Sequence, residues 1–100
     1  MTETVTDRFG NSIYLTDERW HHIIDDDNHP EMDGYRDRVL DVLRKGYRRQ
    51  DPLDPGKFKY FALYDDLSLN NMIVVIVKFG FDREDQPNNF VLTSYQVYDY

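Results

Sequence analysis

The spacing of apolar and polar residues at the start of the chain predicts two short strands around a turn. The strands are expected at residues 3–6 and 12–15. Gly10 and Asn11 lie between them and belong to the residue types that form tight turns. Thr16 directly follows the second strand and is a favourable N-cap, so a helix is expected to begin there.

Two amphipathic helices are predicted next. The first covers residues 17–25, where apolar residues recur at helical spacing. Pro30 closes the polar segment that follows, because proline disrupts the interior of a helix. The second helix is expected to begin near Asp33 or Gly34 and to end at Gly46. Its apolar stripe, at i, i+4, i+7 and i+8, consists of Tyr35, Val39, Val42 and Leu43.

The second half of the chain is predicted to consist of strands. Its turns are rich in Pro, Gly, Asp and Asn, the residues that interrupt regular structure. Residues 72–79 are apolar on both faces, so we expect them to form a central strand. The four strands are predicted at residues 47–51, 57–64, 72–79 and 89–98.

The predicted order of elements is therefore ββααββββ. This order indicates an α+β fold in which two helices pack on a four- to six-stranded antiparallel sheet. No repeat or linker divides the chain, and 100 residues correspond to one ordinary domain. We therefore expect a single domain over residues 1–100.

The amino-acid composition limits the classes of function open to this chain. The net charge of −7, from 19 acidic and 12 basic residues, disfavours nucleic acid as a partner, because phosphates repel an acidic protein unless its cations cluster. No cysteine is present, which excludes disulfides, Cys-based zinc sites and thiolate catalysis. The first residues lack the features of a signal peptide, and the longest apolar run is far shorter than a membrane span. A cytoplasmic protein without a membrane partner is expected.

The acidic segment between the two helices is the first candidate site. Calcium takes about six to eight oxygen ligands, and the end of a helix supplies unpaired carbonyls beside this segment. The segment does not fit the EF-hand pattern, since His29 and Pro30 stand where Asp or Asn and Gly are required. The alternative is a solvated acidic loop. The predicted Ca²⁺ ligands are Asp25, Asp26, Asp27, Asn28, Glu31, Asp33 and Asp37, joined by Asp65 and Asp66 from a later turn.

Basic residues concentrate between positions 36 and 59, which hold eight of the twelve. Such a cluster is typical of a phosphate-binding stripe. Ion pairs with the surplus of carboxylates are the alternative explanation. Histidine is the side chain most often used for general acid–base chemistry, so His22 and His29 are candidates for that role, and a structural or surface role is the alternative for both.

Several short motifs resemble the barnase, EndoU, colicin and RelE-like nuclease domains. The matching pieces are Leu15-Thr16 before Trp20, His22-Ile23, His29-Pro30-Glu31-Met32, Arg48-Arg49, the apolar strand Ile73–Lys78 and Phe90-Val91-Leu92-Thr93-Ser94-Tyr95. The resemblance covers roughly residues 12–98. It implies an RNase-like site formed by His22, His29, Arg49, Thr93 and Tyr95.

The chain also looks like the small, acidic CcbP-type calcium-binding proteins of cyanobacteria, which lack an EF-hand. That resemblance implies calcium buffering or signalling, including in heterocyst differentiation. The leading hypothesis from the sequence is therefore a cytoplasmic, non-enzymatic protein whose partner is the calcium ion. The alternatives are an RNase of the barnase and RelE-like class, or an inactive relative that serves as an interaction module.

Overall fold

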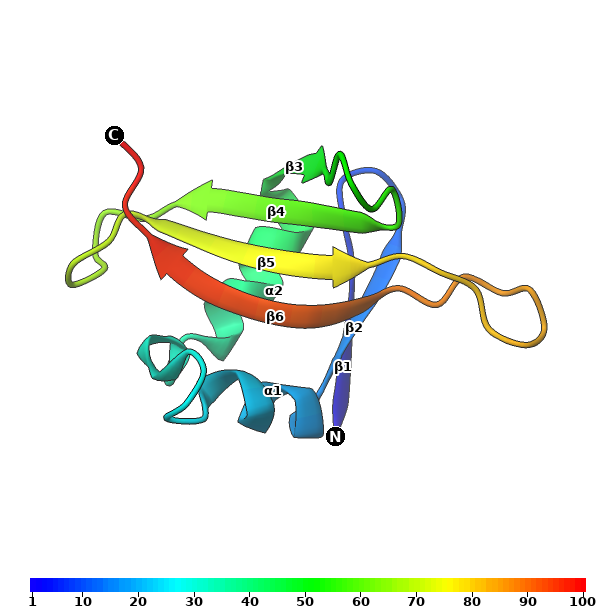
Figure 1. Cartoon of the computed structure of the whole chain (residues 1–100), viewed down its shortest axis with the longest axis horizontal. Helices are drawn as coiled ribbons and strands as arrows, with labels where there is room; N and C mark the ends of the chain where they lie inside the picture. The colour runs from blue at the N-terminus through cyan, green and yellow to red at the C-terminus, as the bar shows by residue number, and fades with distance from the viewer.

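The computed structural model describes residues 1–100 and consists of a six-stranded sheet with two α-helices (Figure 1). The α+β class predicted from the sequence is confirmed. A single turn of 3-10 helix, η1, stands between the helices, so the order differs from the predicted ββααββββ by this element. The elements are β1 (Thr2–Thr6), β2 (Ser12–Thr16), α1 (Asp17–Ile24), η1 (Pro30–Met32), α2 (Arg36–Lys45), β3 (Tyr47–Gln50), β4 (Lys57–Leu63), β5 (Met72–Lys78) and β6 (Phe90–Val97).

The sheet is mixed, and the prediction of a purely antiparallel sheet is wrong. Its strand order is β1-β2-β6-β5-β4-β3, and β2 runs parallel to β6 where Tyr14 pairs with Phe90. The contact is short. Its backbone bond joins Tyr14 N to Asn89 O at 3.0 Å, and the Asn89 side chain donates to Ser12 O at 3.0 Å. A tight turn forces its two strands to be antiparallel, but β2 and β6 are joined by the rest of the chain, so their direction is free.

The second helix begins two or three residues later than predicted. Pro30 begins η1, a position where its missing N–H costs nothing. Gly34 then has a φ of 90°, the left-handed region that suits glycine. The chain enters α2 only at Arg36, so the segment between the helices is a folded connection with a helical turn of its own.

The end of α2 requires glycine for a different reason. A Cβ added at Gly46 would lie 2.5 Å from the carbonyl oxygen of Val42 and 2.8 Å from that of Phe61. The chain therefore passes between the helix and β4 at a distance that only hydrogen permits. It then starts β3 at Tyr47, on the edge of the sheet.

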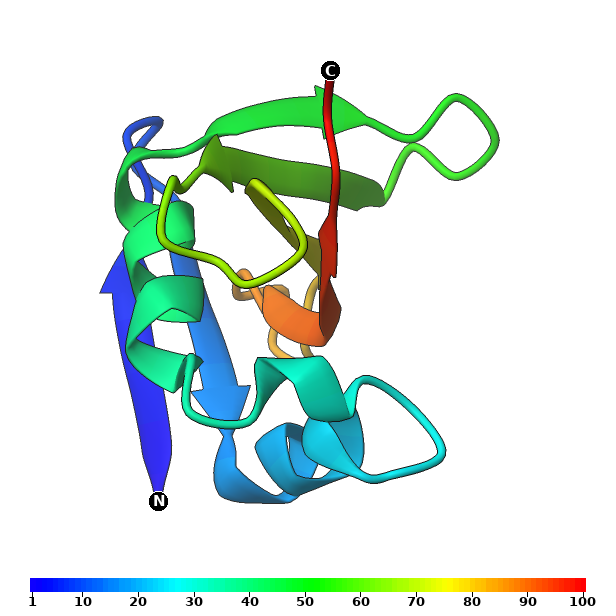
Figure 2. The same cartoon turned by 90° about the vertical axis from the view of Figure 1, so that its left-hand side faces the viewer.

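The core lies between α2 and one face of the sheet. Figure 2 shows the β1–β2 hairpin on one side of α2 and the strands β3 and β4 above it, so the sheet curls around the helix. The sheet's opposite face, called here the outer face, is turned away from α2 in Figure 1 and carries no helix over β4 and β5. Neither helix has the length and apolar character needed to cross a membrane. The core side chains include Val39, Val42, Leu43, Tyr60, Ile73, Val75 and Val77.

Candidate functional site

A row of four residues crosses the outer face from the edge strand to β6. Arg49 pairs with Lys59, Lys59 with Ile76, and Ile76 with Thr93. Residues paired across neighbouring strands project to the same side of a sheet. Three strands separated in the sequence therefore place two cations, one apolar side chain and one hydroxyl in line.

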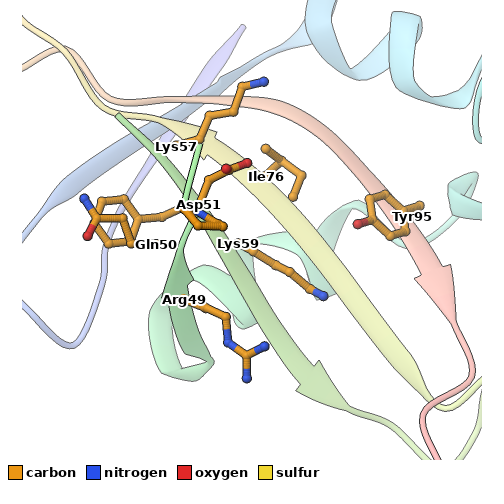
Figure 3. A pocket seen from close by; sticks show the side chains of 9 residues that line it. Arg49, Gln50, Asp51, Lys57, Lys59, Ile76 and Tyr95 are labelled. Atoms are coloured by element: carbon orange, nitrogen blue, oxygen red, sulfur yellow. The ribbon is translucent and has the colours of Figure 1, made fainter. Parts of the chain in front are cut away.

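A shallow hollow of about 230 Å³ lies over this row (Figure 3). Lys57 adds a third cation, and Ile76 and Tyr95 supply apolar surface. The side chains of Lys59 and Tyr95 extend from β4 and β6 toward the space over β5. The one carboxylate in the lining, that of Asp51, accepts hydrogen bonds from two backbone N–H groups of the following turn.

Ion pairs divide the basic residues into two groups. Between positions 36 and 59, four of the eight cations are paired with carboxylates: Arg36, Arg38, Lys45 and Arg48. No ion pair involves the other four, Arg44, Arg49, Lys57 and Lys59. Three of these unpaired cations line the same hollow. Pairing with acids therefore explains half of the basic cluster and leaves the outer face positively charged, in a chain of net charge −7.

His29 lies beside Tyr95 at the β6 side of the outer face. The centroids of the two rings are 5.5 Å apart. The His29 backbone N–H donates to the carbonyl of Ile23 at 2.9 Å, which ties this residue to the end of α1. Nδ1 of His29 is 3.5 Å from Oε2 of Glu31. Glu31 is itself bonded to β6, because the Gln96 side chain donates to its carbonyl at 3.0 Å.

Glu31 therefore lies on the Nδ1 side of the His29 ring. The imidazole of His29 packs on the phenol of Tyr95, which lines a hollow with three cations, and these groups are suited to proton transfer at a phosphate ester.

Four of the five residues of the expected RNase-like site are gathered at the outer face. Arg49 and Tyr95 line the same hollow, Thr93 stands in the same row as Arg49, and His29 packs on Tyr95. The exception is His22. It is exposed on α1 and lines a separate surface hollow with Thr16, Glu18 and Arg19.

The acidic segment is organised by its own backbone. Asp25 caps α1, and its Oδ1 accepts from the N–H of Asp27 at 3.0 Å. The Asn28 side chain donates to the carbonyl of His22 at 2.8 Å. Because His29 bonds the carbonyl of Ile23 as well, two of the helix-end carbonyls expected as free ligands are already occupied.

The remaining predicted calcium ligands lie apart. Asp66 forms a two-pronged pair with Arg38, and the hydrogen bonds from Arg38 hold the pKa of that carboxyl below its usual value. No three histidine or acidic side chains come together in a group that could hold a metal ion. The other predicted carboxylates are exposed, namely Asp26, Asp27, Glu31, Asp33, Asp37 and Asp65. Calcium binding stays a prediction.

Sequence reasoning placed Lys57 and Lys59 in the basic cluster but not in the RNase-like site. Their spacing of two residues in a strand was the available signal, since it places both side chains on one face. It also counted Arg48 in that basic cluster, whereas Arg48 anchors β3 from the inner face. The Arg48 guanidinium lies 4.2 Å from the ring centre of Phe9 and 4.4 Å from that of Phe58. The two neighbouring arginines therefore differ in role, since Arg48 packs against the inner face and Arg49 projects its charge from the outer face.

Comparison with protein families, with characterised proteins and with solved structures gives no match to this chain. Its function must therefore be argued from its own side chains. The arrangement best suited to a function is the hollow lined by cations without carboxylate partners and by Tyr95, on which His29 packs.

Proposed function

We propose that the outer face binds RNA and cleaves its phosphodiester bonds. One observation carries the proposal. Arg49 and Lys59, both without a carboxylate partner, share a hollow with Tyr95, and His29 packs against the ring of that tyrosine. Cations and a phenol therefore line one hollow, and an imidazole packs on that phenol, in an otherwise acidic protein.

The ribose 2′-hydroxyl supplies the nucleophile. Nε2 of His29 accepts the proton of this hydroxyl as its oxygen attacks phosphorus. The bond from phosphorus to O5′ breaks, and the leaving oxygen takes a proton from the hydroxyl of Tyr95. His29 then returns its proton through solvent to the tyrosinate. The products are a 2′,3′-cyclic phosphate and a free 5′-hydroxyl, and no external co-reactant is consumed.

Arg49 and Lys59 stabilise the charge that builds up on phosphate. The planar guanidinium of Arg49 is suited to two parallel hydrogen bonds with phosphate oxygens, whereas Lys59 acts as a compact point charge. Fixed cations that face a developing negative charge lower the barrier without reorganising. Thr93 adds a neutral hydroxyl at the far end of the row.

Product analysis tests the mechanism. Wild-type protein is incubated with a single-stranded RNA oligonucleotide and with the same oligonucleotide carrying one 2′-deoxy position. Cleavage that yields a cyclic phosphate, and that stops only at the 2′-deoxy position, is expected. Cleavage at the 2′-deoxy position would contradict the proposal, because the nucleophile would then have to be water. Tyr95→Phe, which keeps the ring that packs on His29, is expected to slow the reaction.

Calcium binding at the acidic segment is a second candidate. The observation that favours it is a set of carboxylates that form no ion pair, namely those of Asp25, Asp26, Asp27 and Asp33. Bound Ca²⁺ would relieve the repulsion among these carboxylates. A calorimetric titration of chelator-treated protein, with Mg²⁺ as control, tests it. Saturable heat with Ca²⁺ but not Mg²⁺ is expected, and no heat at millimolar Ca²⁺ would rule the site out.

A further inference from the structure

A second hollow adjoins the first on the outer face. It has a volume of about 210 Å³ and is lined by Arg49, Lys59, Phe61, Met72 and Asp99. The two hollows share Arg49 and Lys59 and no other residue. The cationic pair therefore stands between two separate recesses, and each recess has an apolar wall of its own.

The second hollow has an aromatic floor. Phe61 pairs with Tyr47 across β3 and β4, and their ring centroids are 6.1 Å apart. Tyr47 is 66% exposed on the edge strand. Stacking of a nucleobase on such a ring is favourable and does not depend on the identity of the base, because every base has a π face.

Asp99 gives this hollow a chemistry different from that of the first. Its backbone is fixed by Asn71, whose side chain donates to Asp99 O at 2.7 Å and accepts from Asp99 N at 2.7 Å. Figure 2 shows this end of the chain rising from β6 past β4 toward β3. A carboxylate repels phosphate but accepts hydrogen bonds from the N–H groups of a base. The second hollow is thus suited to a base beside a phosphate, and unsuited to a second phosphate.

We infer that the ligand of the outer face is a single-stranded RNA segment of at least two nucleotides. Its phosphate lies between Arg49 and Lys59, one nucleoside occupies the hollow of Tyr95, and the next base stacks on Phe61 beside Asp99. This inference rests on the proposed function for the identity of the polymer. Double-stranded RNA does not fit, because its bases are stacked and paired inside the helix and cannot enter two recesses.

Binding measurements test the arrangement without relying on catalysis. The probe is a short single-stranded RNA with 2′-O-methyl groups, which removes the nucleophile, and its affinity for the full-length protein is followed by fluorescence anisotropy. The same strand annealed to its complement, and inorganic polyphosphate, are the comparison ligands. Single strand is expected to bind at least tenfold more tightly than duplex. Equal affinity for the two would overturn the inference.

Substitutions then locate the second base. Phe61→Ala is expected to weaken single-strand binding roughly tenfold or more, as loss of one base–aromatic stack does, and to leave polyphosphate binding unchanged. Leu63→Ala is the matched control, since Leu63 is exposed on the same strand and lines neither hollow. An equal loss for both ligands with Phe61→Ala, or no loss for either, would contradict a base-binding role.

A variant at Asp99 provides a test that does not disturb the sheet. Asp99→Ala is expected to tighten polyphosphate binding and to weaken single-strand binding, so the ratio of the two affinities falls. A ratio that stays the same would remove Asp99 from base recognition. The proposed function can fail independently of this inference. A protein that binds single strands through Phe61 but does not cleave RNA would support the two base-binding hollows and contradict only the catalytic proposal.

Discussion

The hydroxyl of Tyr60 donates a hydrogen bond to Oδ2 of Asp7, and so joins the middle of the sheet to the turn after β1. Both side chains are buried. Oδ1 of Asp7 accepts from the backbone N–H groups of Phe9 and Asn11 at 2.9 and 2.8 Å. Nη1 of Arg48 lies 3.4 Å from the same tyrosine hydroxyl. The cluster therefore fixes the hairpin, β4 and the edge strand that carries Arg49 to one another.

Tyr60→Phe is expected to lower the free energy of unfolding by roughly 1–3 kcal/mol, the usual range for a hydrogen bond to a charged group. The change removes one donor and keeps the ring in the core. Denaturation by urea measures the effect. Tyr47→Phe is the control, because the Tyr47 ring is exposed on the edge strand and its hydroxyl forms no hydrogen bond within the protein. Equal losses in the two variants would show that the Asp7–Tyr60 bond adds nothing.

Acid should weaken this cluster in a defined pH range. Burial acts to raise the pKa of Asp7, but hydrogen bonds from Tyr60 and Asn11 outweigh it and hold the pKa below its usual value of 3.8. A lowered pKa in the folded state means that the contribution of Asp7 is fully present above about pH 4. It is lost as the pH falls through the folded-state pKa.

The variant Asp7→Asn isolates this contribution. Its free energy of unfolding is expected to lie below that of the wild type at pH 7 and to fall less steeply below about pH 4. Asp33→Asn is the control, because the carboxylate of Asp33 forms no ion pair. Parallel curves for wild type and Asp7→Asn would show that Asp7 does not titrate differently on folding.

Gly46→Ala should destabilise the junction between α2 and β3. The added methyl group would lie 2.5 Å from a backbone oxygen that cannot move without disturbing the helix. A loss of roughly 1–3 kcal/mol, typical of overpacking, is expected in thermal or urea unfolding. Gly80→Ala is the matched control, since its nearest neighbour would be 3.7 Å away. A loss no greater than that of the control would refute the close approach.

The salt dependence of RNA binding should report the three unpaired cations. Each phosphate contact on a single strand contributes about 0.7 to the slope of log affinity against log salt concentration. Replacing Arg49, Lys57 or Lys59 by Gln should therefore reduce the magnitude of that slope, by about 0.7 for each phosphate contact that is lost. Arg44→Gln is the control, because Arg44 is also unpaired but lines a hollow on α2, with Asp37, Asp41 and Tyr64. An unchanged slope in the three variants would place the RNA elsewhere.

The local elements of the fold were predictable, but the contacts between them were not. The strand at residues 72–79 was correct as a central strand because an apolar sequence on both faces leaves few alternatives. The parallel contact between Tyr14 and Phe90 was not predictable, since nothing near either residue encodes its distant partner. The site shows the same division. Arg49 and Tyr95 were proposed as site residues from the sequence. That they line one hollow could not be predicted, because it depends on the register of β3, β4, β5 and β6.

The acidic segment shows how local hydrogen bonds can occupy the carbonyl groups at the end of a helix. Three successive aspartates at a helix end suggested free carbonyls and free carboxylates together. In the structure, Asn28 and His29 bond the carbonyls of His22 and Ile23. The same turn that occupies these oxygens also brings His29 to Tyr95. His29, which does not fit the EF-hand pattern, thus lies at the outer face beside Tyr95.

The most direct test compares two histidines of the same chain. His29→Ala and His22→Ala are assayed for cleavage of the same single-stranded RNA at pH 7, after unfolding curves have shown that both variants are folded. His29→Ala is expected to lose roughly a hundredfold or more in rate, the usual contribution of a general base, while His22→Ala, altered on the exposed surface of α1, keeps the wild-type rate. Cleavage that survives His29→Ala would contradict the catalytic site at the outer face.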